Sequence, residues 1–95
     1  MTVLCYERHP VHPDHRDDYV ALLAEMTVAM RAASGALWAD AAEATDDPPS
    51  FVVLSEWRTP ADADAWESGS ERSGFVDRSE HWLRETGVRR RFSSS

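Results

Sequence analysis

The chain has 95 residues, of which 42% are hydrophobic and 28% charged. These values are typical of one folded domain, and they exclude a disordered, fibrous or membrane-spanning chain. The net charge is −7, and all 10 basic residues are Arg. Because a negative surface repels phosphate groups, nucleic acids and anionic membranes are excluded as main partners. The lone cysteine and the lack of a basic stretch followed by an apolar one at the N-terminus lead us to expect a cytoplasmic protein.

The N-terminal segment predicts a strand followed by a helix. Residues 2–8 alternate as in a strand that is apolar on both faces. The two prolines within residues 9–13 remove donors and fix φ, so we expect the strand to end before them. Asp14 is the expected N-cap of the helix, with Asp17 three residues later as in a capping box.

The middle of the chain predicts the rest of this helix and a hairpin. Apolar side chains recur at spacings of three and four over residues 19–33, and Gly35 is the expected left-handed residue that ends the helix. Residues 36–41 and 50–57 predict two antiparallel strands, because the second is rich in β-branched and aromatic residues. The acidic, proline-containing turn 46–49 separates them.

The C-terminal third begins with a second helix. Thr59 is its expected N-cap, Pro60 its first residue and Asp62 its third. Gly69 interrupts the apolar pattern, so we expect one kinked helix or two short ones.

A last, short, Arg-rich strand over residues 88–92 completes the order β-α-β-β-α-β, and we expect residues 93–95 to fray. This order is typical of an α+β, ferredoxin-like domain over residues 1–95, with a four-stranded antiparallel sheet and helices on one face. The other face would be bare in a monomer. Burial of that face against a second copy predicts a homodimer.

The segment 51–57, the TPADADAW that follows it and a later helical Phe resemble the antibiotic biosynthesis monooxygenase family. Gly35, Asp47-Pro48 and Glu56-Trp57 occupy matching places, and the resemblance extends over residues 3–92. It implies a dimeric α/β barrel in which each protomer has a pocket between its sheet and its helices.

The resemblance also implies an activity. Members oxidise phenolic or quinol polyketide intermediates with molecular oxygen and without metal, flavin or haem, so the expected function is a cofactor-independent monooxygenase acting on a small aromatic molecule. One alternative is a non-catalytic, ligand-binding or cyclase-like accessory barrel. A further alternative is a relative that binds or degrades haem.

The sequence departs from the family at several positions. The oxygenases have an Asn where this chain has Val53, and a valine side chain forms no hydrogen bond. The haem-degrading branch has a Trp that Trp66 matches, but its His falls on Val76 unless a short insertion brings His81 into place. The Asn in the first strand of that branch falls near Glu7.

Three residues are the expected catalytic groups. Trp57 would hold a flat substrate close to oxygen, His81 would act as general base, and Arg90 would hold a phenolate or enolate. The alternatives are a core Trp, an exposed helical His and an edge strand whose charges oppose aggregation. Because successive side chains of a strand alternate, one or two of Arg89, Arg90 and Arg91 face the opposite way from the rest. The expected substrate-binding residues are Tyr6, Trp38, Val53, Trp66 and Phe75.

His9, His12 and His15 are spaced by three, which could place two imidazoles on one side of an extended segment. No Cys or Glu completes a four-ligand set there, so we expect neither a metal nor another cofactor. Cys5 is expected to be a small core residue.

Overall fold

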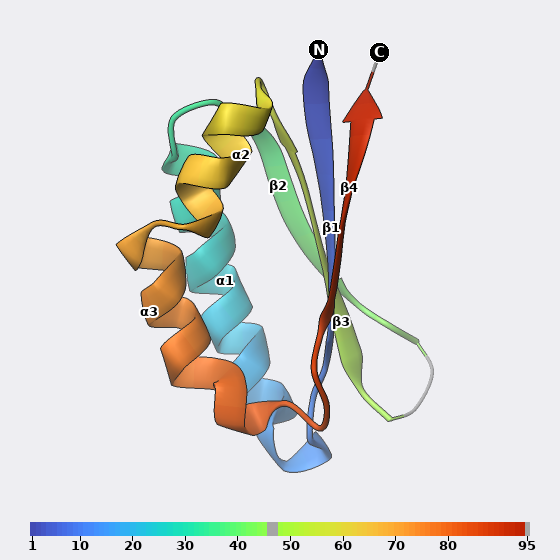
Figure 1. Ribbon diagram of the computed structural model, residues 1–95. Helices are drawn as coiled ribbons and strands as arrows, with labels where there is room; N and C mark the ends of the chain where they lie inside the picture. The colour runs from blue at the N-terminus through green and yellow to red at the C-terminus, as the bar shows by residue number, and fades with distance from the viewer. Residues whose placement is uncertain (46–47, 95) are drawn as a thin grey trace.

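The structure is a computed structural model that describes residues 1–45 and 48–94. A four-stranded antiparallel sheet of order β2-β3-β1-β4 carries all the helices on one face (Figure 1). This arrangement confirms the ferredoxin-like α+β fold. In chain order the elements are β1 Thr2–Pro10, the 3-10 helix η1 Pro13–His15, α1 Arg16–Ala32, β2 Ala36–Glu43, β3 Ser50–Trp57, α2 Pro60–Glu67, α3 Ser70–Ser79, the 3-10 helix η2 Glu80–Trp82, and β4 Val88–Ser94.

β1 continues past the point where we expected it to end. Its pairing with β3 runs to Pro10, which lies opposite Ser50. The pairing with β4 already ends at Arg8, opposite Val88. The missing N–H of Pro10 therefore costs no ladder hydrogen bond on the β4 side, where the neighbouring strand has stopped.

The expected capping box at Asp14 is wrong. Asp14 lies inside η1, and α1 begins at Arg16 with His15 as an N-cap that forms no side-chain cap hydrogen bond. Pro13 at the first position of η1 favours a tight turn there. Asp17 and Asp18 instead lie in the first turn of α1, where negative charge complements the helix dipole.

The later boundaries follow the expected pattern closely. Gly35 has a left-handed φ of 82°, and β3 has the expected bounds. β2 is two residues longer than expected, and the Asp46-Asp47 part of the expected turn lies outside the described residues. The hydroxyl of Thr59 caps α2 by accepting the Asp62 N–H at 3.1 Å.

The second helical region is divided into α2, α3 and η2, with Gly69 between α2 and α3. β4 includes Ser93 and Ser94, which pair with Val3 and Thr2, so these two serines do not fray as expected. Ser95 lies outside the described residues. None of the helices in the described ranges has the length and apolarity needed to cross a membrane.

The core fills the space between the helices and the sheet. Trp57 of β3 stacks on Trp66 of α2 with 6.1 Å between ring centroids, and Tyr19 of α1 stacks on Phe51 of β3 at 5.4 Å. Other buried apolar members of the core are Val3, Cys5, Val11, Leu23, Met26, Met30, Ala39, Val53 and Ala63.

Arginine side chains lie at both edges of the sheet, which are β2 and β4. At the β2 edge, the Nε of Arg31, which lies on α1, donates to the main-chain oxygen of Ala39 at 2.8 Å. Arg16 pairs with Glu43 at the far end of the same strand, at 2.6 Å. β4 carries the consecutive arginines 89–91.

Two glycine substitutions test the backbone geometry. A Cβ at Gly35 would collide with the Asp62 side chain at a left-handed φ, whereas a Cβ at Gly74 inside α3 meets open space. We expect Gly35→Ala to lower the free energy of unfolding by about 1–3 kcal/mol. Gly74→Ala is expected to raise it by about 0.5–1 kcal/mol. Urea denaturation measures both, and equal stability of the two variants would contradict this account.

Candidate functional site

A small cleft lies between β1, β4 and α2. Because side chains alternate along strands, β1 and β4 turn Cys5, Glu7, Arg89 and Arg91 toward the helices, where Cys5 pairs with Arg91 and Glu7 with Arg89. Glu67 of α2 faces them. The cavity among these groups has a volume of about 190 Å³ and is lined by Cys5, Tyr6, Glu7, Glu67, Arg89, Arg90 and Arg91. We call it the charged cleft.

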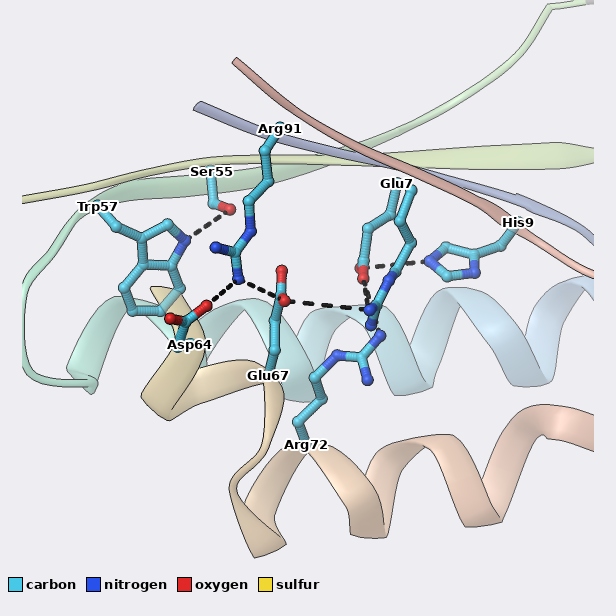
Figure 2. Close-up of polar contacts among 9 residues, drawn as sticks. Glu7, His9, Ser55, Trp57, Asp64, Glu67, Arg72 and Arg91 are labelled. Carbon is cyan, nitrogen blue, oxygen red and sulfur yellow. Dashed lines mark hydrogen bonds and ion pairs between the residues drawn. The ribbon is translucent and has the colours of Figure 1, made fainter. Parts of the chain in front are cut away.

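A row of ion pairs crosses the charged cleft (Figure 2). Arg91 contacts Glu67 at 2.6 Å and Asp64 at 2.7 Å, which joins β4 to α2. Arg89 lies between Glu7 and Glu67, with a nitrogen 4.0 Å from a carboxylate oxygen of each. The cleft therefore contains charges of both signs in alternation.

Glu7 is the buried centre of this row. Arg72 of α3 donates to Glu7 at 2.8 Å, and the His9 ring nitrogen lies 3.4 Å from the other carboxylate oxygen. The exposed fraction is 12% for the Glu7 side chain and 14% for each of the two partners. Burial alone would raise the pKa of Glu7, but the hydrogen bonds and charges of His9 and Arg72 outweigh it and lower the pKa from 4.5 to about 2.

The lowered pKa of Glu7 predicts a pH dependence of stability. The ionised carboxylate stabilises the fold above about pH 4.5, and this stabilisation is lost as the pH falls toward 2. Such a shift corresponds to about 3 kcal/mol. We expect Glu7→Gln to be less stable than wild type at neutral pH and to lose less stability between those two pH values. Denaturant unfolding at several pH values measures this, with the exposed Glu85→Gln as control; a Glu7→Gln profile parallel to wild type would contradict it.

The expected site residues occur in three separate places. In the core, Trp57 and Val53 are each 1% exposed, and the Trp57 Nε1 donates to the Ser55 Oγ at 3.0 Å. Trp66 is also buried, and Phe75 is half-buried against the same core. None of these four residues is among those that line the charged cleft, and their contact with a ligand stays a prediction.

A second group lies on the sheet face that no helix covers. Trp38 donates its indole N–H to Glu56 at 2.9 Å, and the Arg90 guanidinium lies over the Phe92 ring at 5.2 Å. An apolar hollow of about 350 Å³ on this face is lined by Leu4, Cys5, Tyr6, Trp38, Leu54, Ser55 and Phe92. We call this surface the open sheet face. Arg90 thus faces away from Arg89 and Arg91.

His81 is an exposed residue of η2, apart from both groups. Its ring centroid is 6.2 Å from that of His15, which hydrogen-bonds to Asp18 at 3.1 Å and stacks on Trp82. The three N-terminal histidines do not converge, because His9 turns toward Glu7. Within residues 1–45 and 48–94, no three potential ligands come together to hold a metal ion.

Sequence reasoning missed Arg72 as a partner of the cleft. Glu7 could be placed at the helix-covered face from strand alternation, but Arg72 follows the Gly69 break, where helix phase is undefined. Only the packing of α3 brings its guanidinium to Glu7, 65 residues away in sequence.

The sequence profile described as antibiotic biosynthesis monooxygenase matches residues 3–78. A comparison of the sequence with curated proteins gives no match.

Several solved structures share the fold. Rv0793 from Mycobacterium tuberculosis has a TM-score of 0.90 at 20% identity, over 100% of this chain and 96% of that one. A conserved protein from Methanosarcina mazei has a TM-score of 0.91 at 10% identity, over 100% and 94%. A variant of SnoaB, a cofactor-independent oxygenase from Streptomyces nogalater, has a TM-score of 0.83 at 14% identity, over 98% and 92%. At such identities the likeness concerns the fold alone.

Proposed function

Because the chain belongs to the antibiotic biosynthesis monooxygenase family, we propose that it oxidises a small aromatic, phenolic or quinol substrate with molecular oxygen and without a cofactor. The family match over residues 3–78 carries this proposal. The charged cleft between the sheet and the helices supports it, because it offers a partly enclosed space beside polar groups.

The proposed reaction needs few catalytic groups from the protein. An electron-rich phenolate or enolate reduces oxygen itself, so that one oxygen atom enters the product and the other leaves as water. The protein binds the substrate away from bulk water and holds oxygen near its reactive carbon. Glu7 is a poor proton acceptor at neutral pH because its pKa is about 2. This favours substrates that lose their proton easily.

The proposed activity predicts oxygen consumption. Purified, metal-stripped protein is expected to consume oxygen faster than buffer does when quinols, anthrones or naphthols are added without a cofactor. An oxygen electrode measures the rate, and product analysis shows whether oxygen enters the substrate. The absence of enzyme-dependent uptake across this panel would count against the activity.

Trp57 is the residue expected to hold the flat substrate close to oxygen, and it is buried in the core. Trp57→Ala would open a core cavity and cost about 3–5 kcal/mol, so a loss of activity would have no clear cause. Trp57→Phe keeps most of the packing, and we expect it to lower kcat/KM at least about tenfold. Trp82→Phe is the matched control. Equal activity of both variants would remove Trp57 from the mechanism.

The open sheet face supports a homodimer as part of the proposal. Trp38, Leu54 and Phe92 are exposed by 41%, 40% and 43%, and they surround the apolar hollow. Contiguous apolar surface of this kind is typical of an interface. A second copy that meets this face would cover the hollow in both chains by two-fold symmetry.

Sedimentation measures this assembly. We expect the wild-type chain to sediment as a dimer and Leu54→Asp to sediment as a monomer, because the carboxylate would be buried without a partner. Val28→Asp is the control, since Val28 is 63% exposed on α1. Dimers of Leu54→Asp, or dissociation of Val28→Asp to the same extent, would contradict the assignment of the interface.

A non-catalytic binding or cyclase-like function is the second candidate. The observation that favours it is Val53, which stands where the oxygenases carry an Asn and is 1% exposed in the core. Its methyl groups cannot orient a substrate by hydrogen bonding. Binding of the aromatic panel without oxygen uptake would support this candidate.

A further inference from the structure

Arg89 differs from the other arginines that face the charged cleft. Its nearest carboxylate oxygens, on Glu7 and Glu67, are both 4.0 Å away, and its side chain is 49% exposed. Within the described parts of the chain its guanidinium forms no hydrogen bond, since both contacts exceed hydrogen-bond distance. Its donors are therefore not used by the protein.

The neighbouring arginines are engaged. Arg72 donates to Glu7 at 2.8 Å, and Arg91 contacts Glu67 at 2.6 Å and Asp64 at 2.7 Å. Short, charge-assisted contacts of this kind fix both partners in place. Opening either pair to receive a ligand would leave a carboxylate without its partner.

The carboxylates of the cleft are engaged by the same contacts. Glu7 accepts from Arg72 and lies beside His9, and Glu67 accepts from Arg91. The cleft thus has spare donors at Arg89, while each of its two carboxylates already accepts a hydrogen bond from another arginine. A guanidinium with free donors matches the two oxygens of a carboxylate, or the single oxygen of a phenolate.

We propose that Arg89 binds the anionic oxygen of an aromatic acid or phenolate whose ring occupies the charged cleft. The assignment of the ring rests on the proposed function. A cavity of about 190 Å³ is smaller than the sites that hold drug-sized ligands, which favours a single ring at this position. The role falls to Arg89 rather than Arg90, whose side chain lies over Phe92 on the open sheet face.

Binding of benzoate and of its uncharged isostere benzamide tests this. Titrations followed in the ¹H–¹⁵N spectrum give both dissociation constants and show whether each variant is folded. Wild type is expected to bind benzoate about tenfold more tightly than benzamide, which is the range for a hydrogen bond to a charged group. Arg89→Gln is expected to abolish this preference while it leaves benzamide binding unchanged, and Arg89→Lys to retain part of it.

Two further variants make the test specific. Arg58→Gln removes an exposed arginine outside the cleft and is expected to keep the wild-type preference. Arg90→Gln tests the competing assignment. The proposal is overturned if wild type binds neither ligand, if it binds both equally, or if Arg90→Gln loses the preference and Arg89→Gln keeps it.

The outcome is separable from that of the proposed function. A preference for benzoate that depends on Arg89, without oxygen uptake from any substrate, would uphold the anion site and reject the oxygenase. Oxygen uptake from neutral quinols by a protein that shows no preference for benzoate, or whose preference survives in Arg89→Gln, would uphold the oxygenase and reject the anion site.

Discussion

The buried carboxylate of Glu7 is the constraint on which the helix-covered side of this protein depends. A carboxylate that is 12% exposed is tolerated only with partners that replace water, and Arg72 and His9 supply them. Arg72 lies on α3, whose only buried residue is Ser79. Since α3 has so little apolar burial of its own, the ion pair to Glu7 is the polar contact that ties its first turn to the sheet (Figure 2).

The charged cleft and the exposed apolar surface are also separated from each other by the sheet. The space above β1 and β4 is lined by charged side chains, while the aromatic residues Trp57 and Trp66 stack against each other in the core. The large apolar hollow lies on the opposite side of the sheet, around Trp38. The charged cleft and the apolar hollow therefore lie on opposite faces of one sheet. Because side chains alternate along a strand, odd and even positions of the same strand contribute to different faces.

Local sequence signals predicted most of the fold. Gly35, the Thr59 cap and the β-branched run of β3 each specify a structure through their own chemistry, and the family resemblance from the same region is confirmed by the match over residues 3–78. The prediction of a helix N-cap at Asp14 was wrong because Pro13 begins the 3-10 helix η1, and α1 starts only at Arg16. The site was harder, because its ion pairs join residues far apart in sequence. Strand alternation separated Arg90 from its neighbours, but nothing local indicates that Arg91 pairs closely with two carboxylates while Arg89 does not.

The arginines along both sheet edges have a consequence for how copies of this chain meet at high concentration. A bare edge strand is a template on which a further strand adds, and repeated addition produces open ribbons and fibres. Arg31 already holds the main-chain oxygen of Ala39 on one edge, and three consecutive arginines repel an approaching copy at the other. Growth along the sheet is thereby disfavoured in both directions. Association through the open sheet face is not hindered in this way, and a two-fold contact there ends after two copies.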